Sequence, residues 1–272
     1  MDRREAVLRE LNVYPLWQRR ALPVPTEVEQ PAQVMPASEP GGGEADTRRA
    51  EMGIVALNPS NTNSPSDGGA GDAGDGIANF DWPQLKVAVR DCTLCRLRAG
   101  CTQTVFGVGD QQADWLFVGE GPGADEDALG EPFVGQAGKL LDNMLAAIRL
   151  KRGKNVYIAN IVKCRPPENR NPAADEIAQC LPYLERQIAL IQPKLIVALG
   201  KTAATSLLGK EATIASLRGS LHDRNGIPLI VTYHPAYLLR SPSEKAKVWQ
   251  DLCLAVQTME EAVGRVTPAA TQ

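Results

Sequence analysis

The chain has 272 residues, enough for one medium-sized domain with additional material outside it. Its formal net charge of −3 is unevenly distributed, because residues 21–80 carry nine acidic and two basic side chains while the rest of the chain is mildly basic. No run of about 18 apolar residues occurs, and the N-terminus lacks an apolar stretch with a cleavage site, which argues against a membrane span and a secretory signal. We therefore expect a cytoplasmic protein, and the basic remainder weakly favours a polyanionic partner.

The first 80 residues are not expected to contain a folded domain. Residues 1–20 place apolar side chains at helical spacing, which predicts a short amphipathic segment and a candidate site for a protein partner. Residues 21–80 are rich in Gly, Pro, Ala, Asp and Ser, so they cannot bury enough apolar surface to offset the entropy lost on ordering. We predict a disordered acidic linker over residues 21–80 and a folded domain over residues 81–265.

From residue 81 onward, short apolar strands alternate with amphipathic helices. The strands are predicted at residues 115–118, 156–159, 195–199 and 228–232, and the main helices at 137–150, 173–191, 202–208 and 243–263. This alternation is typical of a parallel sheet covered by helices on both faces. The predicted fold class is α/β: a three-layer α/β/α arrangement with a central four-stranded parallel sheet, preceded by the disordered N-terminal region.

Each predicted strand ends beside residues that carry potential chemistry. These strand exits are residues 119–123 (Gly-Glu-Gly-Pro-Gly), 160–164 (Asn-Ile-Val-Lys-Cys), 198–201 (Ala-Leu-Gly-Lys) and 233–240 (Tyr-His-Pro-Ala-Tyr-Leu-Leu-Arg). Ligands of open α/β sheets bind outside the carboxyl ends of the strands. We therefore expect these four segments to form one active-site rim.

Two of these segments resemble nucleotide-binding motifs, and both fail in detail. Residues 119–124 fit the dinucleotide fingerprint, but three acidic residues follow at once and would repel a pyrophosphate. We also expect no helix to open there, because Gly130 and Pro132 interrupt the segment. Residues 200–202 resemble the end of a phosphate-binding loop, but Leu195 stands where that loop requires glycine. Neither segment is predicted to bind a nucleotide.

Four of the six cysteines form two spaced pairs. Cys92 and Cys95 make a Cys-x₂-Cys knuckle, and Cys164 and Cys180 bracket a basic, proline-rich segment. In a reducing compartment, clustered cysteines bind metal more often than they form disulfides. A four-thiolate site suits Zn²⁺ and an iron–sulfur cluster equally well on its chemistry alone. Two further cysteines lack a metal-binding spacing and are expected to be structural: Cys101 and Cys253.

Together these segments resemble the family 4 uracil-DNA glycosylases, the iron–sulfur branch of the uracil-DNA glycosylase superfamily. The resemblance covers about residues 82–260. It rests on the cysteine pairs and on four motifs in order, which are residues 119–123, 131–138 (Glu-Pro-Phe-Val-Gly-Gln-Ala-Gly), 160–167 (Asn-Ile-Val-Lys-Cys-Arg-Pro-Pro) and 234–240. It implies a [4Fe-4S] cluster, which spacing alone left undecided between zinc and iron, and a monofunctional enzyme of base excision repair that acts on uracil-containing DNA. We expect a monomer.

The resemblance also implies how the base is bound, because a glycosylase must flip its target out of the stack, cover it and bind its polar edge. Phe133 offers an aromatic face. The amide of Asn160 carries a donor and an acceptor, which match O4 and N3–H of uracil. His234 would donate to O2 and stabilise charge on the departing base. Gly119 and Gly121 complete the predicted substrate contacts.

Glu120 is the predicted catalytic carboxylate, since it could favour a cation-like sugar and orient or deprotonate the attacking water. Glu126 is the alternative. Residues 238–240, Leu239 and Arg240 among them, are predicted to enter the gap left by the flipped base. Residues 165–172 contain no histidine, which favours ordinary hydrolysis over the covalent trapping known in another branch. The basic side chains predicted to contact DNA phosphates are Lys163, Arg165, Arg170, Lys201 and Arg240.

The cluster is expected to be structural, because hydrolysis of an N-glycosidic bond moves no electrons. Its predicted role is to pin residues 165–170 against the cysteine knuckle. Two other functions are kept as alternatives: a nucleic-acid-binding iron–sulfur module without glycosylase activity and, less favoured, a zinc-stabilised interaction protein. Nicking of a uracil-containing oligonucleotide after alkali separates the enzyme from both.

Overall fold

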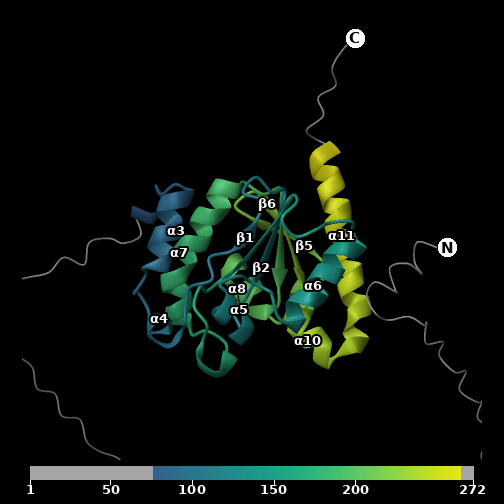
Figure 1. Ribbon diagram of the computed structural model, residues 1–272. Coiled ribbons are helices and arrows are strands. Elements are labelled where there is room, and N and C mark those ends of the chain that lie inside the picture. Colours follow the sequence, from purple (N-terminus) through teal and green to yellow (C-terminus); the bar gives the residue numbers. More distant parts are fainter. Residues whose placement is uncertain (1–75, 265–272) are drawn as a thin grey trace, which may run out of the picture. The chain divides into compact units, whose positions relative to one another are not determined.

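The computed structural model describes residues 76–264, shown in colour in Figure 1. The predictions for residues 1–20 and for residues 21–75 of the linker therefore lie outside the described residues. Ile77 is buried and Phe80 packs against the core, so folded structure begins a few residues before the predicted boundary.

Helix α3 (Trp82–Arg90) opens where the domain was expected to begin. Its start is fixed by reciprocal capping, in which Gln84 N donates to Asp81 Oδ1 at 2.9 Å and Asp81 N donates to Gln84 Oε1 at 3.0 Å.

A single sheet forms the centre of the described region, with six strands in the order β1-β3-β2-β4-β6-β5. Its four central strands are parallel, and they are β2 (Trp115–Gly119), β3 (Val156–Asn160), β4 (Leu195–Leu199) and β6 (Ile227–Thr232). Every residue of β2, β3 and β4 is buried, as expected for strands covered on both faces. The predicted four-stranded parallel core is confirmed.

The strand count was too low, because two antiparallel edge strands extend the parallel core. β1 (Val108–Gly109) pairs with β3, and β5 (Leu221–Arg224) pairs with β6. β1 has only two residues, and β5 is a polar strand with alternating exposure. The β5–β6 turn is Asn225-Gly226, with φ of 51° and 84°, as two-residue hairpins require.

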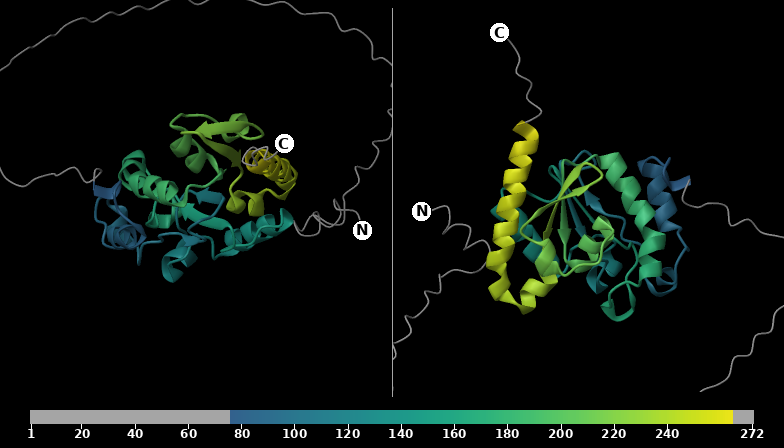
Figure 2. Two further views of the ribbon diagram at one scale, coloured as in Figure 1. Left: turned by 90° about the horizontal axis from the view of Figure 1, so that it is seen from above. Right: turned by 180° about the vertical axis from the view of Figure 1, so that it is seen from behind.

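Helices cover both faces of the sheet, which confirms the three-layer arrangement (Figures 1 and 2). Strand residues alternate between the layers, so Leu116 and Val118 pack in one core and Trp115 and Phe117 in the other. The first core includes α3, α7 (Ala174–Ile191), α8 (Lys201–Leu208) and α9 (Ile214–Leu217), and the second includes α6 (Gln136–Ala147), α10 (Pro235–Arg240) and α11 (Lys245–Gly264). The short remaining elements are α4 (Leu97–Gly100), η1 (Pro167–Asn169) and η2 (Pro242–Glu244). Among the described helices, none has the length and apolar character needed to cross a membrane.

A helix does open directly after β2, contrary to expectation. α5 (Ala124–Leu129) has six residues and ends at Gly130. The φ of Gly130 is 79°, a left-handed conformation that glycine adopts readily because it has no Cβ. Its start is stabilised by Glu126 Oε2, which accepts from Gly123 N at 3.0 Å. Acidic residues suit the first turn of a helix, so the acids that disfavour a bound pyrophosphate also favour this helix.

Candidate active site

The carboxyl ends of the four parallel strands meet at one edge of the sheet, as predicted. Gly119 of β2 is paired with Asn160 of β3, and Gly200 N, just after β4, donates to Thr232 O of β6 at 2.8 Å. A cavity of about 420 Å³ opens at this edge. The predicted site residues that line it are Glu120, Gly121, Phe133, Asn160, Arg170, His234 and Arg240.

Asn160 is held deep in this cavity. It is 2% exposed, and among the described residues its Oδ1 has no hydrogen-bond partner. A Cβ at Gly119 would lie 2.4 Å from that oxygen and 2.5 Å from Cζ of Phe133. Gly119 does not line the cavity itself, but it leaves the space in which both side chains lie.

Lys163 lies behind Asn160 and faces inward. It is 1% exposed, and its Nζ donates to Asn160 O at 2.9 Å and to Gln187 Oε1 at 2.7 Å. The prediction that Lys163 contacts a DNA phosphate is therefore wrong, because its ammonium is enclosed by protein. Burial lowers the pKa of Lys163 to about 8.

His234 is positioned as a neutral hydrogen-bond donor. Its Nδ1 accepts from Ala236 N at 3.2 Å at the start of α10. Burial, helped by the charge of Arg240, lowers the pKa of His234 to about 4, so the ring is neutral at pH 7. A neutral imidazole that accepts at Nδ1 carries its proton on Nε2. The ring also stacks on Phe133, with centroids 5.5 Å apart and planes 30° apart.

The carboxylate of Glu120 is held by a residue that the sequence did not single out. Thr202, in the first turn of α8, donates from Oγ1 to Glu120 Oε2 at 2.5 Å. Burial raises the pKa of Glu120, and the Thr202 hydrogen bond opposes that shift. Thr202 belongs to the Gly-Lys-Thr segment that had been considered only as a phosphate loop. Its position just past a strand exit was the available signal.

Glu126 has a different role from Glu120. Its carboxylate accepts from three backbone N–H groups, those of Gly123 at 3.0 Å, Val134 at 3.0 Å and Gly135 at 3.1 Å. These bonds tie the loop after β2 to the loop that carries Phe133. Glu126 lines the same cavity, but its oxygens are already engaged.

The predicted DNA-facing residues lie in varied surroundings. Leu239 is 47% exposed, whereas the adjacent Leu238 is 1% exposed and belongs to the core. Arg165 donates from Nε to Asn169 Oδ1 at 2.8 Å, and Lys201 lies 3.4 Å from a carboxylate oxygen of Glu211. Contact of Leu239, Arg165 or Lys201 with DNA stays a prediction.

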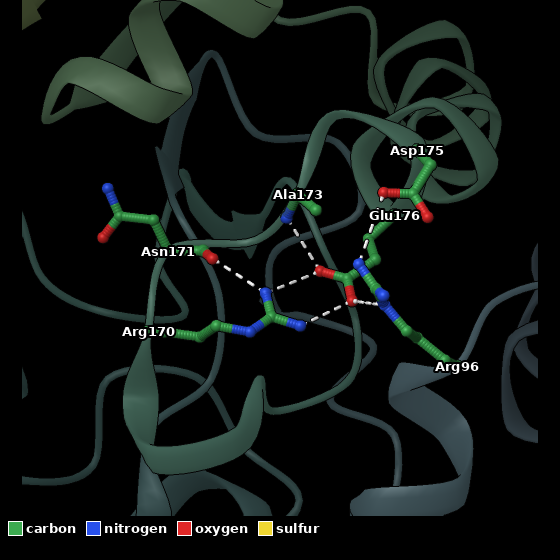
Figure 3. A network of polar contacts seen from close by, with 6 residues as sticks. All are labelled: Arg96, Arg170, Asn171, Ala173, Asp175 and Glu176. Atoms are coloured by element: carbon green, nitrogen blue, oxygen red, sulfur yellow. Dashed lines mark hydrogen bonds and ion pairs between the residues drawn. The ribbon is translucent and has the colours of Figure 1, made fainter.

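Arg170 takes part in an ionic network centred on the buried Glu176, although the Arg170 and Arg96 side chains are 39% and 66% exposed (Figure 3). The Glu176 carboxylate is fully buried and accepts from Arg170 NH1 and NH2 at 2.8 and 2.7 Å, from Arg96 Nε at 2.8 Å and from Ala173 N at 2.7 Å. These contacts, that of Arg170 first, lower the pKa of Glu176 to about 2. Because Arg96 follows the knuckle, the network joins the knuckle to residues 165–172 and to α7.

The four predicted metal ligands lie around one small internal cavity. Cys92, Cys95, Cys164 and Cys180 line it together with apolar side chains and with Arg98, Lys163 and Gln179. Burial raises the pKa of Cys180 to about 11 and raises that of Cys95 and Cys164. Cys180 Sγ accepts from Lys163 N at 3.2 Å. Cys101, set aside on spacing, lies beside Cys164, and its proximity further raises the pKa of Cys164.

Comparison with known proteins identifies the family. The sequence model of the Uracil DNA glycosylase superfamily matches residues 106–253, which include all four strand exits. The chain belongs to this superfamily. It is 43% identical to the type-4 uracil-DNA glycosylase of Archaeoglobus fulgidus over 171 residues, covering 60% of this chain and 85% of the relative. The corresponding protein of Thermotoga maritima is 45% identical over 161 residues, covering 58% of this chain and 83% of the relative.

More distant matches separate the branches of the superfamily. The type-4 uracil-DNA glycosylase of Pyrobaculum aerophilum is 38% identical over 93% of its length, whereas the type-5 uracil-DNA glycosylase of the same organism is 31% identical over 64%. The predicted assignment to the type-4 branch of the uracil-DNA glycosylases is thereby confirmed.

Proposed function

We propose that this chain flips uracil out of DNA into the cavity beside Asn160 and hydrolyses its N-glycosidic bond, leaving an abasic site. The observation that carries the proposal is the buried Oδ1 of Asn160, which has no partner among the described residues. A buried acceptor needs a donor, and N3–H of uracil supplies one while the amide NH₂ donates to O4. Cytosine reverses both groups, so it would leave the amide mismatched.

His234 and Phe133 suit the remaining parts of the base. The Nε2–H of neutral His234 is available to O2 of uracil, where negative charge develops as the bond to the sugar breaks. Because the His234 ring is neutral, it stabilises the charge on O2 by a hydrogen bond and does not have to transfer a proton to the departing base. The Phe133 ring, stacked beside His234, offers an apolar face to the flipped base.

Glu120 is the better candidate for handling the attacking water. Among the described residues the Glu120 carboxylate accepts one hydrogen bond, from Thr202, whereas the Glu126 carboxylate accepts three. Glu120 therefore retains the capacity to orient or deprotonate water and to favour a cation-like sugar. Arg240 at the cavity rim and the exposed Leu239 are the proposed contacts to the DNA around the gap.

We assign a [4Fe-4S] cluster to Cys92, Cys95, Cys164 and Cys180. The four thiols line one cavity, and cysteine thiolates are the usual ligands of such clusters. The likeness to the type-4 uracil-DNA glycosylases favours an iron–sulfur cluster over zinc. When bound, the cluster would cross-link the knuckle to α7 and to the segment after β3.

The function is tested by incubating the protein with a uracil-containing oligonucleotide and then treating the product with alkali, which cleaves the strand at an abasic site. We expect a nick at the uracil and none in a matched oligonucleotide with cytosine at that position. Binding of DNA without any nick would favour the alternative, a nucleic-acid-binding iron–sulfur module without glycosylase activity. Heat-inactivated protein and the Asn160→Asp variant serve as controls for contaminating glycosylases.

A further inference from the structure

The loop that carries Phe133 is strained. Phe133 has a φ of 57°, in the left-handed region that a bulky side chain rarely adopts. Its ring is 6% exposed and stacks on His234. A conformation of this kind is strained and persists only where surrounding contacts hold it.

Opposite charges hold this loop from two sides. Arg152 donates from NH1 to Pro132 O at 2.8 Å and from NH2 to Phe133 O at 2.7 Å. Glu126 accepts from the next two backbone N–H groups, those of Val134 and Gly135. The Arg152 guanidinium binds two successive carbonyls and the Glu126 carboxylate binds the next two N–H groups. Together they fix the path of the loop on both sides of Phe133.

Arg152 is itself oriented by α6. Its Nε donates to Asp142 Oδ1 at 3.0 Å, and its side chain is 22% exposed. The same helix approaches the loop so closely that a Cβ at Gly138 would lie 1.7 Å from Phe133 O. The planar guanidinium can donate to two carbonyls and a carboxylate at once, which a lysine ammonium cannot do with the same geometry.

We propose that Arg152 is a positioning residue for base binding, which holds the strained Phe133 in place to stack on the flipped uracil. Arg152 lies outside every motif that marks the family in this sequence and does not line the cavity. It acts through the backbone carbonyls of Pro132 and Phe133. The inference rests on the proposed function, because it requires that a base be bound against this ring.

A double-mutant cycle tests the proposal, with Arg152→Met, Phe133→Ala and the pair together. Inhibition by free uracil and single-turnover excision are both measured, since inhibition reports base binding without the chemical step. We expect Arg152→Met to weaken inhibition by free uracil about tenfold, the order of a lost base–aromatic stack. In the Phe133→Ala background the same change should have less than about a twofold effect, because the residue through which it acts is gone.

Three further measurements keep the outcome decisive. Lys151→Met, at the exposed neighbouring residue, should match the wild type, and Arg152→Lys should recover part of the loss. If Arg152→Met does not fold, the cycle is run with Arg152→Lys instead. Equal effects of the Arg152 change with and without Phe133, or unaltered uracil inhibition, would overturn the positioning role alone. Absence of uracil excision by the wild type would overturn the proposed function, and this proposal with it.

Discussion

The base cavity and the cysteine site lie at opposite ends of the segment between Asn160 and Cys164, yet they are organised differently. In the base cavity, three of the proposed functional groups are held by the protein's own contacts: Glu120 by Thr202, His234 by Ala236 N, and the Phe133 loop by Arg152 and Glu126. Asn160 is buried, and its Oδ1 has no hydrogen-bond partner among the described residues. In the cysteine site, four thiols line one cavity, two of them buried and two partly exposed, and burial raises the pKa of Cys95, Cys164 and Cys180.

This difference indicates which site depends on a cofactor. A polar group fixed by hydrogen bonds is ready to act before any ligand arrives, which is how electrostatic catalysis works. A buried thiolate is costly unless a metal or a donor compensates its charge. We infer that the base cavity is preorganised, whereas the geometry of the cysteine site is completed by its cluster. The predictions below test that contrast.

The largest effect is expected at the cysteine ligands. Single changes to alanine at Cys92, Cys95, Cys164 or Cys180 should each remove most of the bound iron and lower solubility, because each thiolate supplies one of the four proposed ligands of the cluster. Iron content and visible absorbance are the measurements. Cys253→Ala is the matched control, since Cys253 is exposed.

Cys101 makes this test sharper, because it lies beside Cys164. We expect Cys101→Ala to retain its iron. Loss of iron from Cys101→Ala, together with full iron content in Cys180→Ala, would show that Cys101 is the fourth ligand.

The Glu176 network should contribute the next largest effect. Glu176→Gln removes the charge that both arginines share, and we expect a loss of about 2 kcal/mol in the free energy of unfolding, measured by urea titration of the iron-loaded protein. Asp175→Asn is the control, because that pair is exposed and its oxygen lies 3.7 Å from Arg96. Equal stability of the two variants would mean that the ionic network around Glu176 adds nothing to the free energy of unfolding.

The same network predicts a dependence on pH. The folded-state pKa of Glu176 is lowered to about 2 from an ordinary value of 4.5. Its stabilising contribution is therefore fully present above pH 4.5 and is lost as the pH falls towards 2. In Glu176→Gln this part of the acid sensitivity should disappear, which urea titrations at pH 6 and at about pH 3.5 would detect.

A smaller effect is expected at Thr202. Thr202→Val removes the hydrogen bond that opposes the raised pKa of Glu120, so that pKa should rise further. Under the proposed role of Glu120 the ionised carboxylate is the active form, so the acid limb of the excision rate should move to higher pH while the plateau rate changes little. Thr202→Ser keeps the hydroxyl and should restore the wild-type profile. An unchanged limb in Thr202→Val would mean that Glu120 does not control it.

Much of the fold could be predicted, because the central strands are apolar runs buried on both faces and the long helices have clear periodicity. The edge strands could not be predicted from hydrophobicity. β1 has only two residues, and β5 is a largely polar strand in which the exposure of successive residues alternates. The Asn225-Gly226 pair is the local sequence signal of the β5–β6 hairpin. The helix α5 was missed because its start depends on the Glu126 carboxylate rather than on periodicity.

The candidate site likewise contains residues that the sequence predicts and residues that it does not. Glu120, Asn160 and His234 lie within two residues of the ends of predicted strands, so sheet topology alone brought them together. Thr202 and Arg152 act through side-chain contacts across 82 and 19 residues respectively, and no local pattern encodes such contacts. Lys163 was assigned to DNA by its charge, whereas its burial was set by its place behind Asn160.

The central claim is that the amide of Asn160 selects uracil, and single-turnover excision by Asn160→Asp from matched uracil and cytosine oligonucleotides tests it most directly. The carboxylate can only accept, so it should repel O4 and reduce uracil excision about 100-fold or more, with at most weak excision of cytosine. His234→Ala, the comparison, should slow excision without relaxing base choice, because O2 is common to both bases. Near-normal uracil excision by Asn160→Asp would contradict the account.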